Sequence, residues 1–231
     1  MQGMLASRVF TNGFSLDFDG IDDYVLVLSD SVFEFAKADA FSVSFWVKES
    51  GSDARFCVAK HNDVTTTFNW DIGIDSSNYP VFRCDSHSGG TSLTGSGTTS
   101  AGWNNVIATY SNGAMEIYLN GSSGGTGTYT GAATANTSYL TFAKAQYSSN
   151  TAAVILDEIA IWNAQLDADA AAVVGASPFD LMYKNGNYDY QSNLVGYWRL
   201  EEGTGATAAD STTNGNNGST INASPWSSDT P

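Results

Sequence analysis

Apolar and polar residues alternate with a period of two along most of this chain. The clearest case is FSVSFWVK (41–48), in which two serines lie on the face opposite Phe41, Val43, Phe45 and Val47. A strand with this pattern turns one face toward a hydrophobic core and the other away from it. The pattern therefore predicts a half-buried β-strand at 41–48.

Segments of this kind recur, and turn residues separate them. The turn signals are SSNYP (76–80), SNG (111–113) and NGSSGG (120–125). The expected strands lie at 14–18, 24–28, 41–48, 55–60, 68–74, 79–84, 104–110, 115–119, 138–145 and 153–162. About ten short strands at this spacing favour an all-β fold, an antiparallel β-sandwich of jelly-roll type.

One stretch, near 167–174, is typical of a helix. Asp167 is expected as its N-cap, alanines fill its interior, and Gly175 is expected to end it. Residues 1–175 are therefore expected to form the jelly-roll domain, with this short helix packed on it.

The composition changes in residues 176–231, which are rich in Asn, Gly, Ser and Thr. Within them LVGYW (194–198) has a strand pattern with both faces apolar, and an unpaired apolar strand would be prone to aggregate. We therefore expect 193–226 to be ordered, as an extension that packs on the same or a neighbouring sandwich.

Charge and apolar content exclude several classes of function. Nine basic and twenty-four acidic residues give a net charge of −15, which repels nucleic acid and favours cations, calcium in particular. No apolar run approaches the roughly 18 residues of a membrane span, and the N-terminus lacks the pattern of a secretory signal. Cys57 and Cys84 are expected on the outer strands of a three-stranded meander, too far apart for a disulfide.

Four segments, in order, resemble the laminin-G-like jelly rolls of the concanavalin A-like lectin/glucanase superfamily. They are SLDFDGIDDYVLV (15–27), FSVSFWVK (41–48), GWNNVIATYSNGAMEIYLNG (102–121) and ILDEIAIWNAQLDADAAAVV (155–174). The resemblance implies a concanavalin A-like sandwich with a lectin-like, non-enzymatic function.

The layout of the whole chain is also similar to that of the stand-alone laminin-G-like proteins of marine tailed phages. That likeness implies a virion surface protein, a capsid decoration or a fibre-like adhesin, with capsid or tail proteins and cell-surface glycans as partners. We also expect a homo-oligomer or a repeated lattice. The alternatives are a secreted, extracellular carbohydrate-binding module and, less favoured, a glycoside hydrolase.

The acidic turn DFDGIDD is the best candidate for a metal site. Asp19, the Gly20 carbonyl and Asp22 are candidate calcium ligands, since calcium takes carboxylate and carbonyl oxygens. Asp157 has the strand parity of Ile155 and Ile159, so it is expected to face apolar residues and to need a positive partner. The resemblance implies a structural calcium between the turn and this strand. The alternative is that backbone donors satisfy these aspartates.

Candidate sugar-binding residues are Trp70, Tyr79, His87 and Tyr147, which lie at or near expected strand ends and loops. Catalysis is not expected, because the chain lacks the paired carboxylates of glucanases of this superfamily. Glu201 and Glu202 are adjacent, so on a strand they would face opposite ways.

Overall fold

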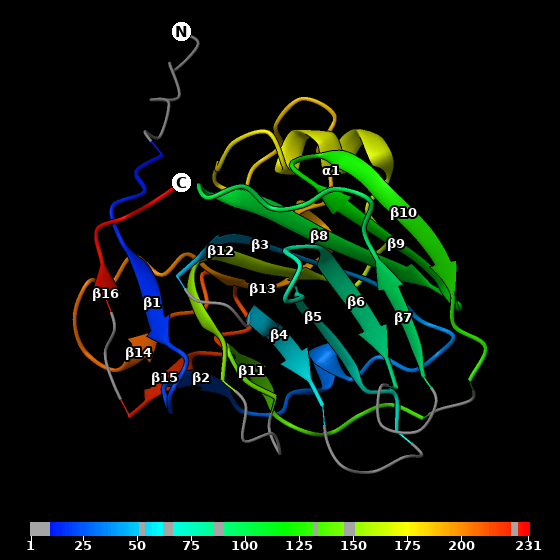
Figure 1. Ribbon diagram of the computed structural model, residues 1–231, viewed down its shortest axis with the longest axis horizontal. Coiled ribbons are helices and arrows are strands. Elements are labelled where there is room, and N and C mark those ends of the chain that lie inside the picture. The colour runs from blue at the N-terminus through cyan, green and yellow to red at the C-terminus, as the bar shows by residue number, and fades with distance from the viewer. Residues whose placement is uncertain are drawn as a thin grey trace, which may run out of the picture.

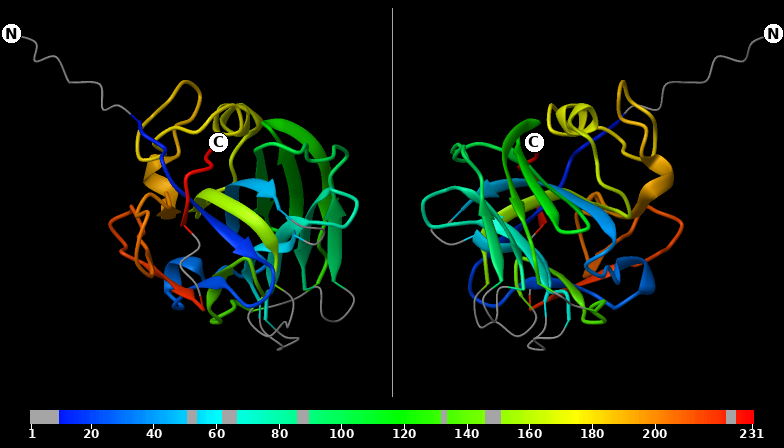
Figure 2. Two further views of the ribbon diagram at one scale, coloured as in Figure 1. Left: turned by 60° about the vertical axis from the view of Figure 1, so that its left-hand side comes forward. Right: turned by 90° about the vertical axis from the view of Figure 1, so that its right-hand side faces the viewer.

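The structure is a computed structural model that describes residues 10–50, 54–61, 67–85, 90–131, 134–145, 151–222 and 226–231, with residues 54 and 55 as backbone only. Two eight-stranded antiparallel sheets pack face to face (Figures 1 and 2). This confirms the predicted β-sandwich.

Sheet A has the strand order β10-β9-β8-β3-β12-β1-β16, and β13 also pairs with β12. Its strands are β1 (Ser15–Asp19), β3 (Ala40–Glu49), β8 (Asn104–Ser111), β9 (Ala114–Leu119), β10 (Ser122–Thr128), β12 (Ala153–Trp162), β13 (Leu194–Trp198) and β16 (Trp226–Ser227).

Sheet B has the order β14-β15-β2-β11-β4-β5-β6-β7. Its strands are β2 (Tyr24–Val27), β4 (Ala54–Lys60), β5 (Trp70–Ile74), β6 (Pro80–Cys84), β7 (Thr91–Thr94), β11 (Leu140–Phe142), β14 (Thr207–Ala208) and β15 (Gly218–Ile221). Two short 3-10 helices, Ser31–Phe33 and Gln191–Asn193, complete the regular structure with helix α1 (Ala168–Val174).

The main core lies between the sheets, and the alternation along β3 predicted its side correctly. The inward residues of β3, namely Phe41, Val43, Phe45 and Val47, are all fully buried in this core. Phe41 stacks on Phe35 with ring centroids 4.7 Å apart. The strands therefore form where alternate residues can be removed from water.

Helix α1 covers the outer face of sheet A, where a second apolar cluster contains Trp162, Ala170 and Val174. The Asp167 side chain accepts a hydrogen bond of 2.8 Å from the Ala170 amide, as expected of an N-cap. The segment that follows α1 continues over the same face (Figure 1).

The C-terminal residues return to the chain's own sandwich. β13 pairs with β12, β15 pairs with β2, and β16 pairs with the free edge of β1. Trp198 lies in the main core and Trp226 packs against it. The Thr230 hydroxyl donates to the Asn12 carbonyl at 3.3 Å, so the two ends of the described chain lie side by side (Figure 1).

Two expectations about small features can be compared directly with the structure. Cys57 and Cys84 are buried on β4 and β6, with β5 between them, and are not joined by a disulfide, as predicted. No helix in the described ranges is long and apolar enough to cross a membrane.

Candidate functional site

The acidic turn is stabilised by its own backbone amides. Both carboxylate oxygens of Asp23 accept from the Asp19 amide, at 3.1 and 3.3 Å, and Asp19 Oδ1 accepts from the Ile21 amide at 2.7 Å. Burial raises the pKa of Asp23 to about 6. Gly20 has a positive φ of 75°, and a Cβ there would lie 2.9 Å from the Ala153 Cβ. Asp22 is exposed.

Asp157 does not lie near this turn. Asp19 is paired with Ala153, four residues before Asp157 along β12, which is about 13 Å at 3.3 Å per residue. The proposed sharing of one calcium ion by Asp19 and Asp157 is therefore wrong in its geometry. Among the described residues, no group of three or more His, Cys, Asp and Glu side chains is arranged to hold a metal ion. Calcium binding by the turn alone stays a prediction.

The side of β12 on which Asp157 lies also differs from the expectation, because β12 contains a β-bulge. Asp157 pairs with Trp46 and Ala160 with Ser44, so two residues of β12 lie opposite the single residue Phe45. Glu158 adopts a positive φ of 47° in this bulge. The extra residue shifts the parity, and Asp157 faces outward from sheet A rather than sharing the inward face of Ile159.

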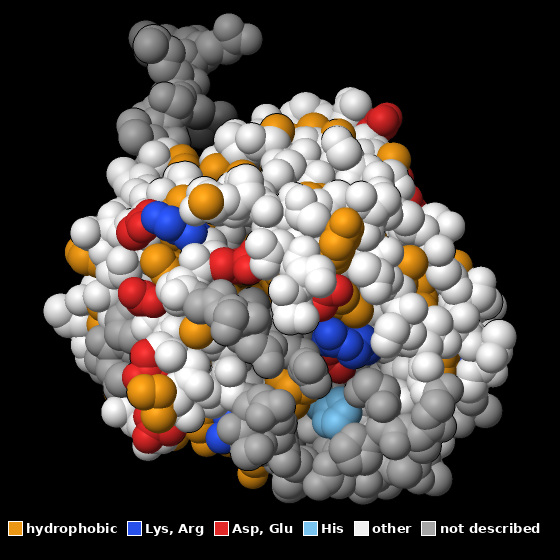
Figure 3. All heavy atoms as spheres, viewed as in Figure 1, with side chains coloured by type: hydrophobic (Ala, Val, Ile, Leu, Met, Phe, Trp, Pro, Cys, Tyr) orange, Lys and Arg blue, Asp and Glu red, His pale blue; other side chains and the backbone are white. Residues whose placement is uncertain are grey.

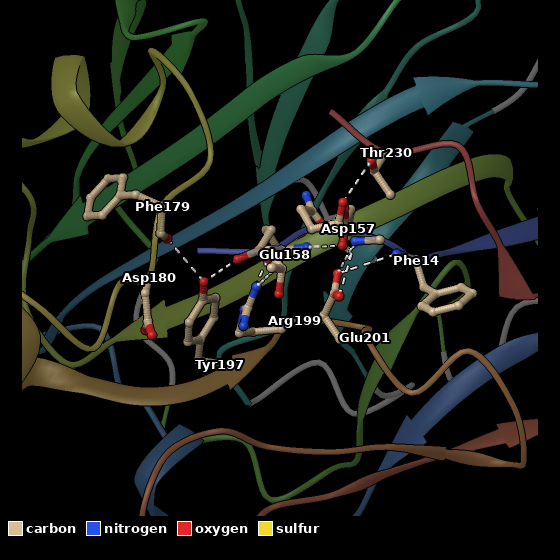
Figure 4. A network of polar contacts seen from close by, with 12 residues as sticks. Phe14, Asp157, Glu158, Phe179, Asp180, Tyr197, Arg199, Glu201 and Thr230 are labelled. Carbon is tan, nitrogen blue, oxygen red and sulfur yellow. Dashed lines mark hydrogen bonds and ion pairs between the residues drawn. The ribbon is translucent and has the colours of Figure 1, made fainter. Parts of the chain in front are cut away.

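A buried polar network forms around this bulge (Figure 4). Tyr197 donates to Glu158 Oε2, and Arg199 Nε donates to Glu158 Oε1 at 3.2 Å. Glu201 accepts from the amides of Gly13 and Phe14. The network therefore joins β12 and β13 to the first residues of the described chain.

Burial raises the pKa of both acids in the bulge, Asp157 and Glu158. Together with the charge of Glu158, it raises the pKa of Asp157 to about 9. Burial also raises the pKa of Glu158 to about 7, although the Tyr197 hydrogen bond and the Arg199 charge act in the opposite direction. A small pocket beside Glu158 is lined by Trp46 and Phe179 among others, and its cavity volume of about 10 Å³ leaves room for roughly one water molecule. A sugar does not fit there.

The structure describes two of the four predicted sugar-binding residues, Trp70 and Tyr79. Trp70 is 1% exposed and packs on Phe41 with ring centroids 5.3 Å apart, so its assignment as a ligand-binding residue is wrong. The reason is that every residue of β5 is buried. Tyr79 is half-buried in the turn between β5 and β6, where its amide donates to Asp75 Oδ1 at 3.0 Å. His87 and Tyr147 lie outside the described residues.

A different aromatic side chain is exposed on the outer face of sheet B. Leu140 faces the core, so the preceding Tyr139 points outward, and it is 39% exposed. The strand register can be continued by one residue beyond the paired ends of β2, β11, β4, β5 and β6. Tyr139 then lies in one row with the residues that follow or precede these strand ends. We call this row the Tyr139 surface; it consists of Leu28, Tyr139, His61 and Asn69, and it ends at Asp85, where a positive φ of 53° breaks the strand.

The Tyr139 surface changes from apolar to polar along its length. Leu28 is 65% exposed, whereas His61 and Asn69 are buried. Asp85 Oδ1 accepts from the Asn69 amide at 3.0 Å, and the Tyr129 hydroxyl donates to Asp85 Oδ2.

An ion pair lies in the next row of the same face. Asp71 of β5 and Arg83 of β6 are directly paired, and Arg83 Nη1 lies 2.7 Å from Asp71 Oδ1. Figure 3 shows basic, acidic and histidine side chains close together over β4, β5 and β6.

The sequence itself indicates that Tyr139 faces away from the core. The alternation in SYLTF assigns Leu140 and Phe142 to one side, which leaves Tyr139 on the other. His61, Asn69 and Asp85 could not be aligned with it from sequence, because this requires the strand order β2-β11-β4-β5-β6.

Comparison with known proteins agrees with this architecture. A laminin-G family model, described as concanavalin A-like lectin/glucanases superfamily, matches residues 19–172. No curated protein matches the chain in sequence.

Several solved structures share the fold at low sequence identity. A Bacteroides ovatus ATCC 8483 protein, provisionally described as carbohydrate binding, has 13% identity and a TM-score of 0.67 over 96% of this chain and 61% of its own. The chain thus spans about three fifths of that protein. The heptameric SAP-like pentraxin of Limulus polyphemus has 14% identity and a TM-score of 0.61, over 93% of this chain and 96% of its own.

Mouse laminin α1 domains LG4-5 have 16% identity and a TM-score of 0.52, over 73% of this chain and 48% of theirs. These likenesses concern the fold alone, whereas the family match covers most of the sequence. The chain belongs to the concanavalin A-like lectin/glucanases superfamily.

Proposed function

We propose that this chain is a non-enzymatic carbohydrate-binding protein and that the Tyr139 surface is its binding face. The observation that carries the proposal is the exposed Tyr139 ring beside the exposed Leu28 side chain, on the outer face of sheet B. The Bacteroides ovatus protein of similar fold, described provisionally as carbohydrate binding, supports it.

The chemistry of a sugar suits this row. A pyranose has a face of C–H groups and an edge of hydroxyls, which both donate and accept hydrogen bonds. An aromatic ring offers a large apolar platform for the first, and imidazole, amide and carboxylate groups offer partners for the second. In the Tyr139 surface the exposed Tyr139 ring offers the platform, and the polar groups of His61 and Asn69 lie buried beside it.

The arrangement of Glu158 and Glu201 supports binding rather than hydrolysis. Glu158 is held by Tyr197 and Arg199, and Glu201 is held by the amides of Gly13 and Phe14. A glycosidase needs two carboxyl groups that flank a substrate. Here the carboxylates hold the chain's own segments together, beside a pocket with room for about one water molecule.

A glycan array probed with the labelled protein tests the proposal. We expect saturable binding to at least one glycan, and we expect Tyr139→Ala to abolish it. Tyr183→Ala is the matched control, because Tyr183 is 55% exposed but lies in the segment after α1, which covers sheet A. Equal loss in both variants, or binding that Tyr139→Ala leaves intact, would contradict the assignment of the site.

For the location of the protein, we propose the surface of a phage particle, with an extracellular module as the alternative. This rests on the resemblance of the sequence to stand-alone phage laminin-G-like proteins. Mass spectrometry of purified particles is expected to detect the chain, and its absence from them would favour the extracellular alternative.

A further inference from the structure

We infer that the Tyr139 surface selects neutral glycans over glycans that carry carboxylate or sulfate groups. The inference rests on the proposed function and adds the chemical class of the ligand. It is argued from the placement of charges around the row.

The cation in the next row of the same face is already paired. Arg83 Nη1 lies 2.7 Å from Asp71 Oδ1, and the two side chains are only 15% and 1% exposed. A guanidinium that binds a carboxylate at this distance has its charge compensated, so it offers little attraction to a second anion. Capture of an acidic sugar by Arg83 would require the pair to open.

Two further described cations, Lys60 and Lys144, do not serve this row. Lys60 Nζ donates to the Ser138 carbonyl at 2.6 Å, and the alternation along β4 puts it on the core side of the sheet, away from His61. Lys144 Nζ lies 4.5 Å from the centroid of the Tyr24 ring. Tyr24 is four residues from Leu28 along β2, or about 13 Å at 3.3 Å per residue.

The row itself contains one acid, Asp85, and neither lysine nor arginine. Burial raises the pKa of the Asp85 carboxyl, although the hydrogen bond from the Asn69 amide acts in the opposite direction. With a net charge of −15 on the whole chain, an anionic ligand meets repulsion at long range. A neutral sugar avoids this repulsion. We expect acidic forms to bind roughly fivefold or more weakly than their neutral counterparts.

The test compares pairs of immobilised glycans that differ only in a terminal sialic acid or a sulfate. The neutral member of each pair is expected to bind more tightly, and the difference is expected to shrink as salt screens the repulsion. Equal or tighter binding of the acidic members, weakened by salt, would overturn the inference while leaving the proposed function in place. Binding to no glycan of either kind would instead reject the proposed function.

A variant pair makes the charge argument specific. Asp71→Asn removes the partner of Arg83, so acidic members are expected to gain affinity relative to neutral ones. Asp71→Asn combined with Arg83→Gln should lose that gain. An Asp71→Asn protein that folds and discriminates as the wild type does would contradict the assigned role of the ion pair. If Asp71→Asn does not fold, the salt series on the wild-type protein decides between the two outcomes.

Discussion

The most unusual residues of this protein are the two acids in the bulge of β12. Asp157 is fully buried, and Glu158 is 3% exposed and has a positive φ. Their adjacency is visible in the sequence, but the bulge is not, because the alternation reads equally well through it. That is why the strand pattern assigned Asp157 to the wrong face.

The buried acids predict a pH dependence of stability. Folding raises the pKa of Asp157 from 3.8 to about 9 and that of Glu158 from 4.5 to about 7. At any pH between the unfolded and the folded pKa of an acid, the folded state binds more protons than the unfolded state. The free energy of unfolding therefore falls as pH rises through this range. Lys60, whose pKa burial lowers to about 8, opposes this trend only above that pH. Urea unfolding from pH 5 to 8 should show a steady decrease.

Asp157→Asn isolates one of the two acids. An amide can still accept from the Glu158 amide, as Asp157 Oδ1 does at 2.8 Å, but it cannot ionise. We expect the variant to lie within about 1 kcal/mol of the wild type at pH 5 and to be more stable at pH 8. A variant that loses stability with pH as steeply as the wild type would show that Asp157 does not contribute.

At the scale of elements, the turn between β9 and β10 contacts helix α1 directly. Asn120 and Gly121 both have positive φ, the signature of a two-residue hairpin turn. A Cβ on Gly121 would lie 2.9 Å from the Ala172 carbonyl oxygen and 3.0 Å from its Cα. Backbone therefore meets backbone at this point, and the glycine sets the distance between hairpin and helix.

Gly121→Ala tests this contact, with Gly215→Ala as the matched control. Gly215 has a similar φ of 68°, but a Cβ there would have no neighbour within 4 Å. We expect a cost of about 1 kcal/mol at Gly215 from backbone strain alone, and about 2–4 kcal/mol at Gly121, where the clash adds to it. Equal shifts in the urea midpoint would argue against close packing of the hairpin on α1.

Strands in which apolar and polar residues clearly alternate were predictable from the sequence, and strands without that alternation were not. The segments around 41–48, 104–110 and 153–162 became β3, β8 and β12, because each has a face that must be buried. The sequence predicts a turn at 120–125, which covers the start of β10, and the strand sequence SSGGTGT has no apolar side chain. β10 is a strand because its backbone pairs with β9 at the edge of sheet A, and this depends on the hairpin rather than on side-chain burial.

At the scale of the whole molecule, the C-terminal end closes the sandwich. Asp229 lies 2.5 Å from Lys48 Nζ and accepts from Trp103 Nε1 at 2.8 Å, while its carbonyl accepts from the Ser15 hydroxyl at 2.6 Å. β16 pairs with the edge of β1 beside these contacts. The composition of 176–231 could not show this, because the partners lie more than a hundred residues away.

Deleting residues 226–231 is therefore expected to lower the free energy of unfolding by about 2–4 kcal/mol, through loss of the β16 pairing and the Asp229 contacts. Asp229→Asn is the control, because it keeps the strand and is expected to cost about 1 kcal/mol or less. Deleting 193–231, which also removes Trp198 from the core, should give an insoluble protein. If the protein that lacks residues 226–231 has the same free energy of unfolding as the full chain, these residues do not stabilise the sandwich.

The central claim is that a sugar binds on the outer face of sheet B at Tyr139. Its most direct test is an NMR titration of the isotope-labelled full chain with the neutral glycan that binds most strongly on the array. We predict saturable shifts of Leu28, Tyr139 and His61 resonances, with Tyr183 and the 19–23 turn unchanged. Shifts confined to the turn or to the segments around α1, with the Tyr139 surface silent, would contradict the claim.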